Sequence, residues 1–335
     1  MHSDETVIAR RDGRIGRILL NRPKALNALD LPMLRACTHA LDGWRDDPHV
    51  HAVVIEGVGD RAFCAGGDIR AIRQDQLDGN RDAVEDFFRT EYALNLAIAT
   101  YPKPYIALID GICMGGGIGV SVHGGYRVVT EHAVLSMPET AIGFFPDIGA
   151  TFFLPRLPGE LGLYLALTGA RLRGSDAVQG GLATHFTRRD RLAALSQALA
   201  NDGPSALARF AEPLPPFSLG PHRGTLDHCF AAETVAGIIR RLDSVGDAWT
   251  LETAATLRAM SPTALCCTLE AMQRGADLTL PHCLEAELRL TRTMMCHPDF
   301  AEGVRAMVID KDRKPRWQPA SVEQVNPEGI AALFE

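Results

Sequence analysis

The chain has 335 residues, of which 46% are hydrophobic and 22% charged, and its formal net charge is −7. This composition is typical of a soluble globular protein with one or two domains, and the scattered basic residues argue against binding to nucleic acid or to an anionic membrane. No apolar run reaches the roughly 18 residues of a membrane-spanning helix. The first sixteen residues lack the apolar core of a signal peptide, so we expect a cytoplasmic protein.

The predicted elements of the N-terminal part follow the periodicity of apolar residues and the positions of glycine and proline. In chain order they are strands at 7–10 and 15–20, a helix containing 32–44, a strand at 51–58, a glycine turn opening a short helix within 61–72, a long helix at 82–100, a strand at 105–109, a glycine turn at 114–117 leading into a buried helix at 118–122, and two short strands within 127–137. This order is a recurring strand–strand–helix rhythm.

The composition changes at about Glu212. The segment EPLPPFSLGPHRG is rich in proline and glycine and predicts a linker at 212–224. Beyond it, residues 225–310 show helical patterns without a convincing strand. We therefore expect an α/β core at 1–211, the linker, and a helical C-terminal region at 225–335.

Eight cysteines are spread along the chain without a C-x-x-C pair or clustered histidines. Zinc sites and redox motifs require such spacing, so we expect reduced, mostly buried thiols and no metal. His297, in the segment CHPDF, is expected to cap a helix rather than to take part in chemistry.

Two turns share one design, in which a buried strand is followed by glycines and the start of a helix. They are CAGGD at 64–68 and MGGGIG at 114–119. Glycine lets a ligand approach the backbone, and a helix N-terminus offers N–H donors. The second turn fits neither a dinucleotide fingerprint nor a P-loop. Each turn alone can be a tight connection, whereas together they can form an oxyanion hole around one carbonyl oxygen.

Two carboxylates, Glu139 and Asp147, interrupt the apolar segment SMPETAIGFFPDIGATFFLPRL at 136–157. Acidic residues are rarely buried unless they are paired or used in chemistry, and no lysine or arginine lies between these two. The functional interpretation is a catalytic pair. The structural alternative is that one acid caps a helix and the other forms a buried ion pair.

The segments RAFCAGGDIRAI, YIALIDGICMGGGIG and MPETAIGFFPDIGATFFLPRL, in this order, resemble the enoyl-CoA hydratase/isomerase (crotonase) superfamily. Within it they are most similar to the 3-hydroxyisobutyryl-CoA hydrolases. The resemblance extends from ILLNRPKALNAL to DFAEGVRAMVIDKDRKPRW, nearly the whole chain. It implies an α/β spiral of strand–strand–helix units with a helical C-terminal region. It also assigns the oxyanion hole to the N–H groups of Gly67 and Gly116, which would bind the carbonyl of a coenzyme A thioester.

The resemblance also indicates which chemistry to expect. Hydratases of the superfamily use two glutamates, and this chain has Gly119 in place of the first and Glu139 in place of the second. A new acid, Asp147, stands where the hydratases have glycine, and the hydrolases are similar to the chain at all three places. The resemblance therefore implies that Glu139 and Asp147 hydrolyse 3-hydroxyisobutyryl-CoA, an intermediate of valine breakdown.

Two routes remain open at this point. Glu139 either attacks the thioester carbonyl to form an anhydride or deprotonates the attacking water, while Asp147 orients or deprotonates the water. No metal or redox cofactor is needed, since coenzyme A is part of the substrate. The alternative functions are an enoyl-CoA hydratase or isomerase that uses Glu139 alone, and a non-catalytic acyl-CoA-binding protein.

Further site residues follow from the resemblance. Glu91, in RTEY, is placed near the acyl pocket, where it would accept a hydrogen bond from the substrate hydroxyl, although a solvated helix-face acid explains it equally well. The residues expected to border coenzyme A are Lys24, Ala65, Asp68 and Ile69. The expected partner is the acyl-CoA substrate. Crotonase relatives form trimers and hexamers, so a homo-oligomer is a further expectation.

Overall fold

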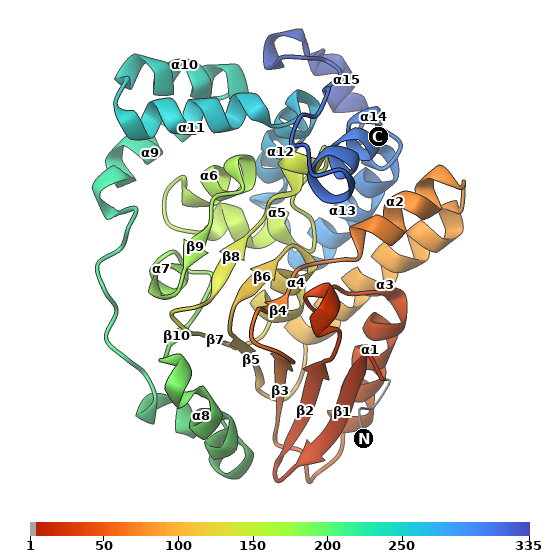
Figure 1. Cartoon of the computed structure of the whole chain (residues 1–335), viewed down its shortest axis with the longest axis vertical. Coiled ribbons are helices and arrows are strands. Elements are labelled where there is room, and N and C mark those ends of the chain that lie inside the picture. Colours follow the sequence, from red (N-terminus) through yellow and green to blue (C-terminus); the bar gives the residue numbers. More distant parts are fainter. Residues whose placement is uncertain (1–4) are drawn as a thin grey trace. The chain divides into compact units, whose positions relative to one another are not determined.

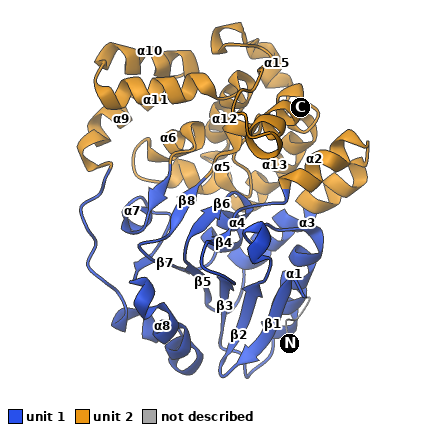
Figure 2. Ribbon diagram, viewed as in Figure 1, with its two compact units in different colours: residues 1–68, 89–136, 171–218 blue, residues 69–88, 137–170, 219–335 orange. Residues whose placement is uncertain are grey.

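The computed structural model describes residues 5–335 (Figure 1). Residues 1–4, part of the stretch behind the prediction about targeting, lie outside the described residues. The chain divides into two compact units (Figure 2). Unit 1 comprises residues up to 68, 89–136 and 171–218, and unit 2 comprises 69–88, 137–170 and 219–335. Each unit is therefore built from three separate stretches of the chain. The division into a core at 1–211, a linker at 212–224 and a helical region at 225–335 stays a prediction.

Unit 1 contains two β-sheets. β1 (Val7–Asp12) and β2 (Ile15–Leu20) form an antiparallel hairpin, and β2 pairs in parallel with β3 (Ala52–Gly57). The larger sheet has the order β1-β2-β3-β5-β7-β10 and the smaller one β4-β6-β8-β9 (Figure 1). The other strands are β4 (Ala62–Cys64), β5 (Tyr105–Ile109), β6 (Ile112–Met114), β7 (Tyr126–Val129), β8 (Val134–Ser136), β9 (Leu172–Arg173) and β10 (His185–Phe186).

One rule generates most of both sheets. Each successive strand pair, β3/β4, β5/β6 and β7/β8, gives its first strand to the larger sheet and its second strand to the smaller one. The first strands pair in parallel with one another, and so do the second strands. This arrangement confirms the predicted strand–strand–helix rhythm and the α/β class.

The larger sheet is covered on one face by a helical layer. Alternate residues of its strands, such as Ala52 and Val54 in β3, point to the same face and are fully buried. They pack with Leu195 and Leu199 of α8 (Arg189–Asp202) and with Leu207 of the following 3-10 helix η4 (Gly203–Arg209). The remaining described helices of unit 1 are the 3-10 helix η1 (Pro23–Ala25), α1 (Leu31–Arg45), α4 (Gly116–Val122), α7 (Ser175–Gln179) and the part of α3 (Arg81–Ala99) from residue 89.

Every regular element described in unit 2 is helical. The elements are α2 (Ile69–Leu77), the first turns of α3, η2 (Glu139–Ile142), α5 (Ala150–Phe153), η3 (Leu154–Arg156), α6 (Leu161–Thr168), η5 (Gly220–His222), α9 (Arg223–Phe230), α10 (Val235–Val245), α11 (Ala248–Ala259), α12 (Pro262–Gly275), α13 (Leu280–Met294), α14 (Pro298–Val304), the π-helical turn η6 (Arg305–Ile309), η7 (Val322–Gln324) and α15 (Pro327–Ala332). The helical prediction for 225–310 is confirmed. No described helix combines the length and apolarity that crossing a membrane requires.

Polar side chains cap several of these helices. Thr234, Asp247 and Ser261 accept hydrogen bonds from backbone N–H groups in the first turns of α10, α11 and α12. His297 caps α14, because its Nδ1 accepts from the backbone N–H of Asp299 at 3.2 Å. The predicted capping role of His297 is therefore confirmed.

Six of the eight cysteines are buried, as the sequence predicts. Cys266 is partly exposed and Cys296 is exposed. Within residues 5–335, no group of three or more histidine, cysteine, aspartate or glutamate side chains is arranged to hold a metal ion.

Candidate active site

The two glycine turns lie side by side in unit 1. β4 and β6, which precede them, pair in parallel, so both turns leave the same edge of the smaller sheet. Gly66 and Gly115 have φ of +104° and +47°, a region that favours glycine. A Cβ atom added to Gly116 would lie 3.3 Å from the backbone nitrogen of Gly67. The structure thus brings together the two residues predicted to donate N–H groups.

The local structure gives each of these N–H groups a defined setting. Gly116 is the first residue of α4, where backbone N–H groups have no acceptor within the helix and where the helix dipole is positive. Gly67 is held by its neighbours, because Leu29 donates its N–H to Gly66 at 2.8 Å and accepts from Asp68 at 2.8 Å. Their role in an oxyanion hole stays a prediction.

Glu91 lies in α3, beside the glycine turns. Its side chain is only 2% exposed, so the alternative of a solvated helix-face acid is wrong. A Cβ atom added to Gly116 would collide with Oε1 of Glu91. The carboxylate is therefore buried against the turn.

The residues expected to border coenzyme A have mixed settings. Lys24 is exposed in the 3-10 helix η1 (Pro23–Ala25), and Ala65 donates its N–H to the carbonyl of the nearby Leu26 at 3.0 Å. Asp68 forms an ion pair with Arg22 at 3.1 Å, which gives its side chain a structural role. Ile69 is partly buried, is the first residue of α2 and belongs to unit 2.

Glu139 and Asp147 both lie in unit 2 and are buried, at 7% and 5% exposure. Glu139 begins η2, which ends at Gly143 with φ of +69°, and its carbonyl accepts from the N–H of Phe144 at 3.0 Å. A side chain at Gly143 would collide with the backbone of Asp299, so α14 packs closely against this turn. The acidic segment is thus fixed by tertiary packing as well as by its own hydrogen bonds.

The loop after Asp147 has an unusual backbone. Ile148 has φ of +56° and Gly149 has φ of +83°, so two successive residues are in the left-handed region. This conformation costs about 1–2 kcal/mol for a residue with a Cβ, and β-branched residues rarely adopt it. Strained residues of this kind cluster at functional sites, where the surrounding structure holds them in place.

A third acid, Glu287 of α13, supplies the contacts that hold this loop. Its Oε2 accepts from the N–H of Gly149 at 2.6 Å, and its Oε1 accepts from the N–H and the hydroxyl of Thr151 at 3.0 and 2.6 Å. Gly149 is the N-cap residue of α5, so Glu287 binds backbone N–H groups at the start of this helix. The structural alternative for Glu139 and Asp147 stays open. Glu287 is not among the residues predicted from the sequence.

Burial raises the pKa of Glu287 to about 8. The negative charge of Asp147 adds to the rise, while the hydrogen bonds from Thr151 and Gly149 oppose it. Burial and the nearby Asp147 therefore both favour the neutral form of the Glu287 carboxyl group.

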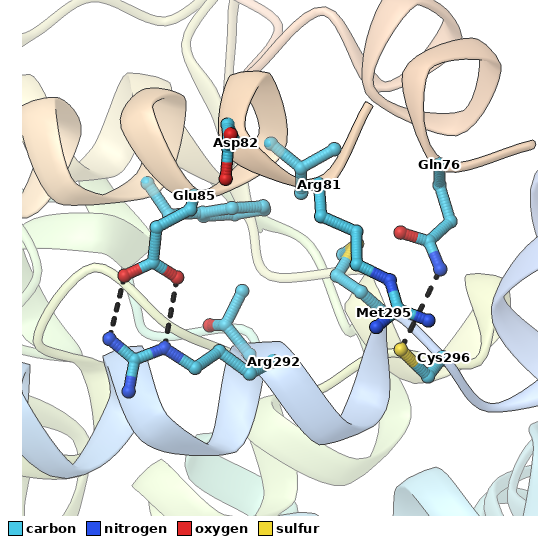
Figure 3. A pocket seen from close by; sticks show the side chains of 10 residues that line it. Gln76, Arg81, Asp82, Glu85, Arg292, Met295 and Cys296 are labelled. Atoms are coloured by element: carbon cyan, nitrogen blue, oxygen red, sulfur yellow. Dashed lines mark hydrogen bonds and ion pairs between the residues drawn. The ribbon is translucent and has the colours of Figure 1, made fainter. Parts of the chain in front are cut away.

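Unit 2 also contains a cavity of about 310 Å³ that none of the predicted site residues lines (Figure 3). It is lined by α2, α3 and α13, and Figure 3 shows Glu85 facing Arg292, with which it forms hydrogen bonds of 2.6 and 2.9 Å. Gln76 contacts the sulfur of Cys296 at 3.7 Å across the same cavity. None of the site residues predicted from the sequence lines it, so it is separate from the carboxylate loop.

Comparison with known proteins places this arrangement in a family. Residues 15–334 match the model of the family described as enoyl-CoA hydratase/isomerase. The match covers nearly the whole chain, and the chain belongs to this family.

Individual relatives carry more specific names. A protein of Xenopus tropicalis named 3-hydroxyisobutyryl-CoA hydrolase, mitochondrial, is 46% identical, and the match covers 99% of this chain and 89% of the relative. The crystal structure of a carnitinyl-CoA dehydratase from Mycobacterium thermoresistibile has a TM-score of 0.95 at 39% identity, covering 99% and 97% of the two chains. That of an enoyl-CoA hydratase from Rhodobacter sphaeroides 2.4.1 has a TM-score of 0.93 at 41% identity, covering 98% and 97%.

The predicted cytoplasmic location is contradicted by these comparisons. Relatives from Xenopus laevis, Bos taurus, Homo sapiens and Mus musculus, at 44–47% identity, are all named as mitochondrial proteins, like the one from Xenopus tropicalis. The prediction rested on the composition of the first sixteen residues. Targeting segments are removed from mature proteins, so the composition of a folded chain does not determine its compartment.

Proposed function

We propose that the protein hydrolyses 3-hydroxyisobutyryl-CoA to 3-hydroxyisobutyrate and coenzyme A, a step of valine breakdown. The observation that carries the proposal is the set of residues at three positions. Glu139 and Asp147 are both buried acids, and the buried residue at 119 is glycine, which has no side chain to act as the first glutamate of the hydratases. The names of the relatives at 44–47% identity support it.

The glycine turns would stabilise the transition state. Attack on a thioester carbonyl moves negative charge onto its oxygen, and in this proposal the N–H groups of Gly67 and Gly116 bind that oxygen. A fixed donor of this kind contributes roughly 3 kcal/mol to lowering the barrier. The leaving thiolate has a parent pKa of about 8.5, so it departs with little help from an acid.

The two acids would deliver the nucleophile. Burial strips water from both carboxylates, and a desolvated carboxylate is a stronger nucleophile and base than a hydrated one. In the proposed reaction Glu139 forms an anhydride with the acyl group or deprotonates the attacking water, and Asp147 orients or deprotonates the water. Glu91 accepts the hydrogen bond of the substrate hydroxyl. The chemistry needs neither a metal ion nor a redox cofactor.

A second candidate function is the hydration of an enoyl-CoA by Glu139 alone. The name of the solved structure at 41% identity, an enoyl-CoA hydratase, favours it. Gly119 speaks against it, because hydration in this family uses a glutamate at that place. A non-catalytic acyl-CoA-binding protein is the third candidate, and the presence of all four proposed catalytic groups argues against it.

One experiment separates the three candidates. The purified protein is incubated with 3-hydroxyisobutyryl-CoA while free thiol is measured, and with crotonyl-CoA while the enoyl absorbance is followed. We expect thiol release from the first and no hydration of the second. Loss of the enoyl absorbance without thiol release would establish the hydratase, and binding without either reaction would establish a binding protein.

Replacement of Gly116 by alanine tests the glycine turns. The added Cβ would collide with Oε1 of Glu91 and shift this carboxylate or the Gly116 N–H. Misplacing a catalytic group by about 1 Å can cost a hundredfold, so we expect thioester hydrolysis to fall about tenfold to a hundredfold.

The matched control is Gly125→Ala in the same unit, where an added Cβ meets nothing within 4 Å. It should retain normal hydrolysis. Normal activity in folded Gly116→Ala enzyme would contradict the role proposed for this turn.

A further inference from the structure

Glu287 belongs to no motif of the reaction, yet it holds the loop that carries Asp147. The two segments are far apart in sequence, since Gly149 and Glu287 are separated by 138 positions. Glu287 is 1% exposed and comes from α13, whose buried face otherwise consists mainly of Leu, Cys and Met. A carboxyl group in such a place is costly to bury, so its three hydrogen bonds to the loop are the compensation for that cost.

The hydrogen bonds of Glu287 reach the loop next to its strained residue, Ile148. Ile148, in the left-handed conformation, joins Asp147 to Gly149, and Glu287 binds the N–H of Gly149 directly. The carbonyl of Asp147 also accepts from Ala150 at 2.9 Å, which closes a tight turn. A left-handed Ile persists only where its neighbours fix it. Loss of the hydrogen bond between Gly149 and Glu287 would therefore let the turn relax and change the direction of the Asp147 side chain.

We propose that Glu287 is a positioning residue for hydrolysis, whose carboxyl group holds the turn at Ile148 and Gly149 and so fixes the direction of the Asp147 side chain. The inference rests on the proposed function, in which Asp147 acts on the attacking water. Glu287 itself touches neither water nor substrate in this account. It acts only through the backbone of the loop.

Other titratable or charged side chains near Glu287 come from α13, α12 and η3. Cys283 is one turn earlier in α13, and Arg274 of α12 lines a small cavity together with Cys283 and Glu287. Arg274 pairs with Glu270 at 2.7 Å, and Arg156 of η3 donates to the carbonyl of Leu278 at 2.9 Å. Both arginines therefore form hydrogen bonds to groups other than Glu287.

Thr151 matters because its hydroxyl can serve both forms of Glu287. It donates to the carboxylate and can instead accept the proton of the neutral acid, while the backbone N–H groups of Gly149 and Thr151 are donors in both cases. An amide at position 287 cannot do the same. Its oxygen would accept from one backbone N–H, while its NH₂ group would face the other.

The test compares Glu287→Gln with the wild type in thiol release from 3-hydroxyisobutyryl-CoA. We expect kcat per folded molecule to fall about tenfold to a hundredfold while KM changes less than twofold. Glu285→Gln is the matched control, because Glu285 lies on the same helix, is 64% exposed and pairs with Arg289. It should behave as the wild type. An unchanged kcat in folded Glu287→Gln enzyme would overturn the proposal.

A double variant separates positioning from general loss of structure. If Glu287 acts through Asp147, Glu287→Gln should lower kcat no further in an Asp147→Asn background, since nothing is left to position. Losses that multiply in the double variant would show an independent structural role and overturn the inference.

A second pair of variants keeps the proposal testable if Glu287→Gln does not fold. Thr151→Val removes one of the three hydrogen bonds at nearly constant shape, and we expect kcat to fall by several fold. Thr151→Ser keeps the hydroxyl and should recover most of that loss. Equal kcat in the two Thr151 variants would count against the inference.

Failure of the proposed function and failure of the positioning role give different results. If the wild type releases no thiol, the proposed function is wrong and the positioning role with it. If the wild type is active and Glu287→Gln is equally active, only the positioning role is wrong.

Discussion

Glu139→Gln is expected to abolish hydrolysis of 3-hydroxyisobutyryl-CoA, with a loss of about four orders of magnitude or more. Both routes need an ionised carboxylate at this position, as the nucleophile in one and as the base in the other, and an amide can be neither. Glutamine fills the same volume, so the buried start of η2 should keep its packing and substrate binding should change little.

The measurement is thiol release under saturating substrate, with Glu285→Gln as an exposed control of the same chemical type. A Glu139→Gln variant with near-normal hydrolysis would rule out both routes. The wild type can distinguish them by single turnover in water labelled with heavy oxygen. Label in the Glu139 peptide, or trapping of an acyl-enzyme by hydroxylamine, establishes the anhydride. Label only in the released acid, without trapping, supports direct attack by water.

Asp147→Asn is expected to lower hydrolysis by about two to four orders of magnitude, the usual contribution of an acid–base group. Asparagine keeps the volume of the side chain and removes its charge and its basicity. The strained residue is the following Ile148, so the substitution leaves the backbone of the turn intact. KM should therefore stay close to the wild-type value while kcat falls.

The check is a full kinetic comparison with the wild type, combined with a spectroscopic measure of folding. Retention of more than half of the turnover in a folded Asp147→Asn enzyme would show that Glu139 works without this partner. The same variant would then deserve the crotonyl-CoA assay, because a single glutamate is what the hydratase interpretation requires.

Much of the fold is readable from local pattern. β5 is fully apolar and β3 is apolar except for Glu56 near its end, and the sequence predicts both within one residue of their observed bounds. β9 and β10 contain two residues each and were not predicted, because so short a strand has no periodicity to detect. β6, of three residues, was hidden for the same reason beside the glycine turn.

The site was readable where the chemistry is local in sequence. The two glycine turns, and the two acids in an apolar segment, are each visible within about twenty residues, and the order of the motifs carries the resemblance. The burial of Glu91 was not readable, because helix α3 is amphipathic and its pattern alone leaves this acid equally able to face solvent. Only the packing of α3 against Gly116 shows it to be buried.

Glu287 did leave a signal in the sequence. In α13 the buried positions include Cys283, Leu284, Leu290 and Met294, and Glu287 stands in that stripe at helical spacing. An acid within an apolar stripe indicates a buried carboxylate. Its partners could not be named, since Gly149 and Thr151 lie more than 130 positions earlier and nothing in the local pattern connects them.

The long sequence separation between the loop that carries Asp147 and Glu287, which binds this loop, has a consequence for synthesis on the ribosome. Chains emerge from the N-terminus, so Glu139, Asp147 and their loop leave the ribosome well before Glu287 of α13 has been made. Until then the N–H groups of Gly149 and Thr151 lack the carboxyl group that binds them in the finished protein. A nascent chain, or a product truncated before α13, would therefore contain every proposed catalytic residue but lack the carboxyl group proposed to position Asp147. The loop would acquire its final conformation only after α13 has been made.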